Sequence, residues 1–169
     1  HHQYSDPTIT QGVKFFQGLL TYAVSIPSFI TAFTIAASLE IAGRKNGSKG
    51  LFGWMVKLPW FNQDKYLFSY FICGLILFTF GGVTGIINAS YSLNAVVHNT
   101  AWLPGHFHMT VAGPVFLGIA GMSLYMYSTM SGKKLMWPRM ATIVPYLWTI
   151  GMLIFSFGMS WGGLRGEPR

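Results

Sequence analysis

The stretch GHFHMTVAGPVFLGIAGMSLYMYSTM, residues 105–130, decides the fold of this chain. It contains no Asp, Glu, Lys or Arg, and a helix of about 20 predominantly apolar residues is long enough to cross a bilayer. The stretch therefore predicts a transmembrane helix, and this helix begins with two histidines. Imidazole is costly in hydrocarbon unless it has a partner, so the two histidines favour a functional site.

Three further stretches have the same character. They run from Val13 to Ala42, from Tyr66 to Ala89 and from Met140 to Trp161. Of the 169 residues, 51% are hydrophobic and only 9% are charged, against about 25% charged in soluble domains. We expect an all-α fold, a polytopic transmembrane helix bundle. Because the chain starts on His1 rather than Met, residues 1–169 are expected to be one segment of a longer or split polypeptide.

The basic residues predict the orientation of the helices. They gather in two loops, one with Arg44, Lys45, Lys49 and Lys57, the other with Lys133, Lys134 and Arg139. Basic loops face the cytoplasm, so the uncharged loop Ser90–Pro104 faces outward, and all five histidines lie in the outer half of the membrane. The net charge of +7 then reflects topology, and the expected surroundings are a lipid bilayer and no nucleic acid.

His106 and His108 are two residues apart, which on an α-helix turns their side chains by about 200°. They cannot easily share one metal ion, but each could hold a separate haem on its own side of the helix. The alternative is a hydrogen-bonded pair at a helix entrance.

The adjacent residues His1 and His2 could share one metal such as copper. They supply only two of the three or four donors that copper needs, so another ligand must come from outside this chain.

Two groups of polar residues accompany the outer end of the bundle. His98, next to Asn99, could bond an anionic group such as a haem propionate, or it could be an exposed loop histidine. Arg165 and Arg169 could clamp carboxylates or anchor the fourth span at the interface.

Thr21, Ser25 and Ser28 form a stripe of hydroxyls on the first span, at relative angles of about 0°, 40° and 340°. Such hydroxyls most often bond to the carbonyl one turn back. A water-assisted proton path is the other interpretation.

Four strings carry a family resemblance: HHQYSDP (1–7), SLEIAGR (38–44), LFGW (51–54) and VVHNTAWLPGHFH (96–108). With them, the chain resembles subunit I of the haem–copper oxidases over essentially all its length, and is most similar to the B-type (ba-type) cytochrome c oxidases. One departure is Asn94, where the B-type pattern usually has an aspartate.

The resemblance implies cofactors and roles for the histidines. His106 would ligate the high-spin, oxygen-binding haem and His108 the low-spin haem, while His1 and His2 would be two of the three ligands of the copper ion CuB. The third copper histidine, the tyrosine cross-linked to it and the second axial histidine of the low-spin haem lie upstream of His1 in the family. This chain is therefore not expected to work alone.

The resemblance also implies roles for the other polar groups. His98, Asn99 and Arg169 would contact haem propionates. Thr21 and Ser28 would fall on the K-type proton pathway.

By the same resemblance, the chain is part of the catalytic subunit of a proton-translocating terminal oxidase in a prokaryotic cell membrane. It would reduce O2 to water with electrons from cytochrome c or a similar donor. Its partners would be the remainder of subunit I and subunit II with a dinuclear copper centre. Two alternatives stay open: a nitric oxide reductase of the same superfamily, with non-haem iron in place of copper, and a non-catalytic membrane transport subunit.

Overall fold

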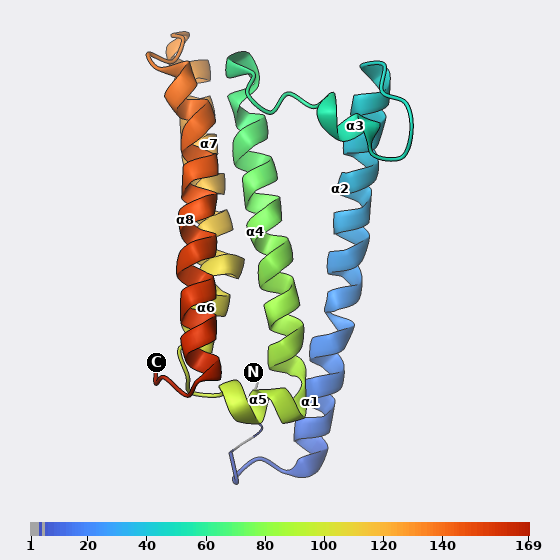
Figure 1. Ribbon diagram of the computed structural model, residues 1–169, viewed down its shortest axis with the longest axis vertical. Coiled ribbons are helices and arrows are strands. Elements are labelled where there is room, and N and C mark those ends of the chain that lie inside the picture. Colours follow the sequence, from blue (N-terminus) through green and yellow to red (C-terminus); the bar gives the residue numbers. More distant parts are fainter. Residues whose placement is uncertain (1–3, 5) are drawn as a thin grey trace.

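The computed structural model describes Tyr4 and residues 6–169. Four stretches of helix in this part are long and apolar enough to cross a membrane, namely Gln11–Lys45, Gln63–Ala89, Trp102–Ser131 and Pro138–Leu164. They run side by side in Figure 1. The predicted all-α transmembrane bundle is confirmed, with boundaries a few residues wider than hydropathy alone predicts.

The first span consists of two helices, α1 (Gln11–Ala23) and α2 (Ser25–Lys45), which meet at Val24. Pro27 explains the break, because its ring lacks an N–H and crowds the carbonyl four residues earlier, at Ala23. The backbone N–H of Val24 still bonds to the carbonyl of Leu20 at 3.0 Å. The chain therefore continues in nearly the same direction (Figure 1).

The third span is also composite. It begins with α6 (Trp102–Phe107), continues as a π-helical segment η2 (His108–Ala112) and ends as α7 (Gly113–Ser131). The helix starts at Trp102, ahead of the predicted start at Gly105, because Pro104 is tolerated in a first turn where backbone N–H groups have no helical acceptor. Single π-helical turns are frequent at functional sites, and this one begins at His108.

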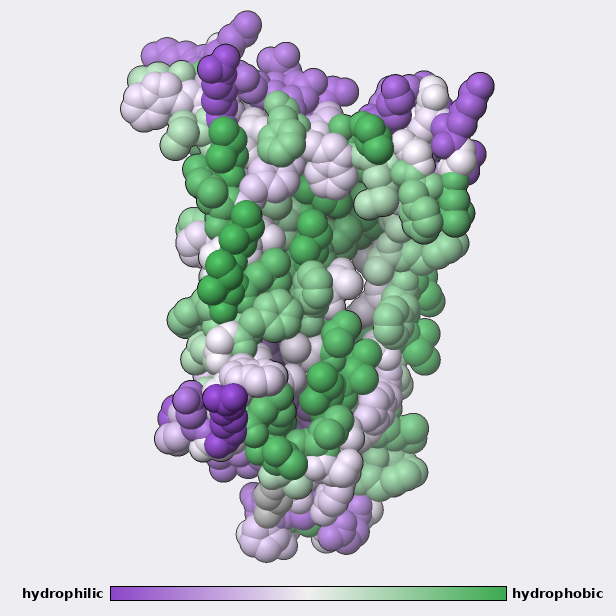
Figure 2. All heavy atoms as spheres, viewed as in Figure 1, coloured by the Kyte–Doolittle hydropathy of each residue, from purple (hydrophilic) through white to green (hydrophobic). Residues whose placement is uncertain are grey.

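The two ends of the bundle differ in what they carry. The loops with the basic residues, between α2 and α4 (Tyr66–Ala89) and between α7 and α8 (Pro138–Leu164), lie at the same end in Figure 1. The C-terminus and a short helix, α5 (Tyr91–Val97), lie at the other end. Figure 2 shows hydrophilic residues gathered at both ends and a mainly hydrophobic belt between them, as a helix bundle that spans a bilayer requires.

The tightly packed part of the bundle is α4 with α7 and α8. Leu77 and Leu117 are fully buried in its core beside Cys73. Close approach of α4 and α7 depends on Gly121, where a Cβ would stand 3.0 Å from the Cβ of Tyr70. Small residues at such crossings are typical of membrane helices.

The first span stands further from this core. Its most apolar window contains no buried residue. Two cavities separate it from α4: one of about 260 Å³ next to His106, and one of about 560 Å³ further along, which α7 also lines. The space beside α4 is therefore available for a group larger than a side chain.

Candidate functional site

His106 lies on α6 and faces α4. Its Nδ1 is 2.9 Å from the hydroxyl oxygen of Thr84, and this hydroxyl donates its own proton to the carbonyl of Gly81 at 2.8 Å. Because a hydroxyl has one proton and that proton is already donated, the oxygen accepts a hydrogen bond from Nδ1–H. The other ring nitrogen, Nε2, then carries a lone pair that can bind a metal.

His108 has the same tautomer for a different reason. Its Nδ1 lies 2.6 Å from the carbonyl oxygen of Pro104, and a carbonyl can only accept, so Nδ1 is protonated and Nε2 carries the lone pair. The ring packs edge-on against Phe155 of α8, with 4.8 Å between the ring centroids.

The two imidazoles therefore belong to different faces of one helix. His106 contacts α4 and His108 contacts α8, as their spacing predicts, and each bonds to its own acceptor rather than to the other histidine. An axial haem ligand needs this arrangement: a neutral imidazole with one nitrogen held by an acceptor and the other available to iron. Both imidazoles have the tautomer that an axial haem ligand needs.

A cavity lies beside His106, between the first span and α4. The cavity of about 260 Å³ is bounded by the first span on one side and by α4 on the other. On the α4 side it is lined by glycines, which leave room next to the imidazole: Gly81, Gly82 and Gly85. His106 and the predicted hydroxyl stripe meet in this cavity, since Thr21, Ser25 and Ser28 line its other wall.

Each hydroxyl of the stripe bonds to its own helix. Thr21 donates to the carbonyl of Gln17 at 2.7 Å, Ser25 to that of Tyr22 at 2.5 Å and Ser28 to that of Val24 at 3.3 Å. This is the backbone bonding that the sequence left open as the alternative to a proton path. The hydroxyl oxygens retain lone pairs for water, so the proton path stays a prediction.

The residues predicted to contact propionates lie together at the end of the bundle that is predicted to face outward. The last residues of the chain pair with the outer loop: Ala101 donates its N–H to the carbonyl of Glu167 at 2.8 Å, and Arg169 donates its N–H to the carbonyl of Asn99 at 3.3 Å. Asn99 has a left-handed backbone, with φ of 62°. Asn99 and Arg169 are exposed and His98 is half-buried.

Two neighbouring polar residues have other roles in the structure. The guanidinium of Arg165 stacks over the ring of Trp161, 5.2 Å from its centroid, which supports the anchoring interpretation for this arginine. Asn94 is fully buried and donates from Nδ2 to the carbonyl of Asn88 at 3.0 Å.

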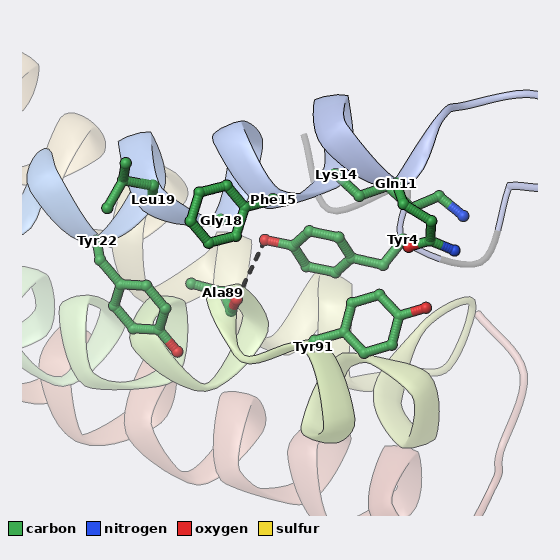
Figure 3. A pocket seen from close by; sticks show the side chains of 9 residues that line it. All are labelled: Tyr4, Gln11, Lys14, Phe15, Gly18, Leu19, Tyr22, Ala89 and Tyr91. Carbon is green, nitrogen blue, oxygen red and sulfur yellow. Dashed lines mark hydrogen bonds between the residues drawn. The ribbon is translucent and has the colours of Figure 1, made fainter.

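The start of the described chain packs against the C-terminal end of α4 (Figure 3). The Tyr4 hydroxyl donates to the carbonyl of Ala89 at 3.1 Å, and the Tyr4 ring lies 5.4 Å from the ring of Tyr91. Burial raises the pKa of the Tyr4 hydroxyl. The predicted copper ligands, His1 and His2, lie outside the described residues. Within Tyr4 and 6–169, no group of three or more His, Cys, Asp or Glu side chains is placed to hold a metal ion.

Thr84 is the residue of this site that the sequence did not indicate. It is separated from His106 by 22 positions, and nothing in a run of apolar residues marks one threonine as the partner of a distant histidine. Only the packing of α4 against α6 brings the two side chains together.

The family model "Cytochrome C and Quinol oxidase polypeptide I" matches residues 1–169. The chain is 46% identical to a cytochrome c oxidase subunit 1 of Thermus thermophilus, over all of this chain and 30% of the relative. A second sequence named cytochrome c oxidase subunit 1, also from Thermus thermophilus, is 42% identical over 63% of this chain and 97% of its own length.

A solved structure agrees with these sequences. The fold matches a cryo-EM structure of a haem–copper terminal oxidase dimer with a TM-score of 0.93 and 47% identity, over all of this chain and 30% of the solved one. The chain thus belongs to the family of cytochrome c and quinol oxidase polypeptide I, and the resemblance to haem–copper oxidases is confirmed. It spans about a third of the length of the full-length relative. Its membership of this family does not favour a transport subunit.

Proposed function

We propose that this chain is part of the catalytic subunit of a proton-translocating terminal oxidase, which reduces O2 to water with electrons from cytochrome c or a similar donor. The observation that carries the proposal is the pair His106 and His108. Both hold Nδ1–H against an acceptor and present Nε2, toward different helices.

Two haems and one copper ion, when bound, supply the electron-transfer and oxygen-binding chemistry. His106 would hold the high-spin haem and His108 the low-spin haem. Because His106 and His108 are only two residues apart in one continuous helical segment, backbone geometry largely sets the separation of the two imidazoles. Packing between separate helices then has little influence on it.

The outer loop would hold the haem propionates. His98, Asn99 and Arg169 offer an imidazole, an amide and a guanidinium, which are hydrogen-bond donors suited to carboxylates. Backbone pairing between Asn99 and Arg169 supports a shared role for them.

His1 and His2 would hold the copper ion, with a third ligand from another part of the protein. They precede Tyr4, whose ring packs at the outer end of α4 beside Ala89. Ala89 is one helical turn beyond Gly85, the glycine next to His106, which supports placing copper and the high-spin haem on the same side of the membrane.

Protons would reach this site from the cytoplasmic side along Thr21 and Ser28. Both residues line the cavity that His106 also lines. Their hydroxyl oxygens can accept a hydrogen bond from ordered water while they donate to the helix backbone.

The first span exposes apolar side chains along most of its length, including Phe15, Phe29 and Phe33. In the assembled enzyme these would meet lipid or the remainder of subunit I. The other partners in this proposal are a second subunit with a dinuclear copper centre and a cytochrome c-like electron donor. The enzyme would lie in a prokaryotic plasma membrane and belong to the B-type oxidases.

The test uses the complete oxidase complex with one histidine changed at a time. We expect His108→Leu to remove the low-spin haem signal from the optical spectrum and largely spare the high-spin one, and His106→Leu to do the reverse and abolish oxygen reduction. Phe107→Leu, between them and exposed, is the matched control and should retain both haems. Loss of the same single haem in both histidine variants would overturn the two-haem assignment. Metal analysis that finds non-haem iron instead of copper would indicate a nitric oxide reductase.

A further inference from the structure

Thr84 makes a contact that the ligand assignments do not explain. Thr84 is 7% exposed on α4 and makes two hydrogen bonds through one oxygen. It donates to the carbonyl of Gly81 at 2.8 Å and meets Nδ1 of His106 at 2.9 Å. Buried hydroxyls in membrane helices usually need only the first of these bonds. The second bond calls for an explanation.

We propose that Thr84 is a positioning residue for His106. Its hydroxyl oxygen accepts the Nδ1–H and so sets the tautomer, the ring orientation and the electron donation of the imidazole that binds the high-spin haem. This rests on the proposed role of His106 as an axial ligand.

The geometry holds the Thr84 hydroxyl in the orientation in which its oxygen can accept a hydrogen bond from His106. Donation to Gly81, one turn back on the same helix, fixes the rotamer of Thr84 and directs the oxygen lone pairs away from α4. Hydrogen bonds in series also polarise one another, so an oxygen that donates its proton becomes a better acceptor. Thr84 therefore offers His106 an acceptor that is oriented before the imidazole arrives.

The contrast with His108 shows why the acceptor matters. His108 bonds to the carbonyl of Pro104, one turn back on its own helix, so its orientation is independent of any other span. His106 depends on a side chain of α4. Its orientation is therefore coupled to the packing of α4 against α6, which is also set by Gly85.

The bond has a predictable electronic effect. An acceptor on Nδ1–H raises the basicity of the metal-binding nitrogen, and outer partners of this kind typically change metal affinity or activity about 10- to 100-fold when removed. Loss of the Thr84 hydroxyl should therefore weaken the iron–Nε2 bond and favour the reduced iron.

The experiment uses the complete oxidase complex carrying Thr84→Val, which keeps the shape and removes the hydroxyl, and Thr84→Ser, which restores it. Thr84→Ala is a second hydroxyl-free variant with a smaller side chain. Thr142→Val is the matched control, because Thr142 on α8 is also buried and donates to a backbone carbonyl of its own helix, that of Pro138 at 3.0 Å.

Two measurements report on the iron rather than on turnover: the iron–histidine stretching frequency of the high-spin haem and its midpoint potential. We expect the frequency to fall and the potential to rise in Thr84→Val and Thr84→Ala, and both to return toward the unmodified values in Thr84→Ser. Thr142→Val should change neither.

If both hydroxyl-free variants keep the unmodified frequency and potential, the Thr84 hydroxyl does not set the state of the imidazole and its proposed role is wrong. That result is distinct from a failure of the ligand assignment. If His106→Leu retains the high-spin haem, His106 is not its ligand, whatever the Thr84 variants show.

Discussion

Gly85 lies directly against the ring of His106. A Cβ at residue 85 would stand 3.1 Å from Cε1 and 3.8 Å from Nε2 of the imidazole. The first distance is shorter than ordinary van der Waals contact, so the histidine ring must turn or α4 must move if any side chain is added. The absence of a side chain at one position of α4 therefore shapes the site on α6.

Gly85→Ala should displace the imidazole and reduce occupancy of the high-spin haem while leaving the low-spin haem in place. The optical spectrum of the purified complex measures both. Gly151→Ala is the control, since a Cβ at Gly151 meets nothing within 4 Å. Equal haem content in Gly85→Ala and the unmodified complex would mean that the ring tolerates the methyl group.

Gly163 has a structural role at the crossing of α8 and α6. A Cβ there would stand 2.8 Å from the Cα of Trp102, which is backbone and cannot turn away. Because overpacking typically costs about 1–3 kcal/mol, Gly163→Ala should lower the thermal denaturation midpoint of the complex. Gly158→Ala, where a Cβ meets nothing within 4 Å, should not. An unchanged midpoint in Gly163→Ala would show that the crossing adjusts easily.

Asn99 allows its backbone and its side chain to be tested separately. Its φ of 62° lies in the left-handed region, which glycine adopts freely and alanine adopts at a cost of about 1–2 kcal/mol. Asn99→Gly should therefore keep the loop and remove the amide, whereas Asn99→Ala should also strain the loop. If the amide holds a propionate, both variants shift the midpoint potential of the high-spin haem. A shift in Asn99→Ala alone would assign the residue to the loop instead.

The sequence predicted the parts of this molecule that depend on local composition. Length and hydropathy alone specify a span such as Tyr66–Ala89, because hydrocarbon leaves the backbone no alternative to a helix. The spacing of His106 and His108 likewise specifies different faces, because the helix fixes the angle between neighbouring residues.

The features that escaped prediction depend on contacts between distant segments or on weak local signals. The short helix α5, Tyr91–Val97, has no apolar stripe long enough to mark it within a predicted loop. Two examples of contacts between distant segments are the bond between Thr84 and His106 and the pairing of Arg169 with Asn99. The first requires α4 and α6 to meet at a particular height and rotation, and the second requires the same of α6 and α8. Hydropathy contains no information on either.

The copper assignment is tested at His2. His2→Ala should deplete copper while both haems remain, because the copper would lose one imidazole and the haem ligands come from another helix. Metal analysis of the purified complex gives the ratio of copper to haem iron. Gln3→Ala, the neighbouring change, should leave that ratio as in the unmodified enzyme. A copper-to-haem ratio unchanged in His2→Ala would remove His2 from the site.

Substitutions at Thr21 and Ser28 distinguish a proton path from hydroxyls that only bond to their own helix. Both bond to carbonyls of their own helix, at 2.7 and 3.3 Å, and both line the cavity next to His106. Loss of such a bond typically costs only about 0.5–1.5 kcal/mol, too little to unfold the bundle. If water bridges the two oxygens, Thr21→Val and Ser28→Ala should slow turnover without changing haem or copper content.

The slowing should be confined to steps that take up protons from the cytoplasmic side, while reduction of the low-spin haem stays fast. Flash-induced absorption changes, read with a pH-sensitive dye, distinguish these steps. Ser128→Ala is the matched control, because its exposed hydroxyl also bonds to its own helix, at 3.0 Å from the carbonyl of Tyr125. Near-normal turnover in both variants would leave Thr21 and Ser28 as helix-bonded hydroxyls with no part in proton uptake.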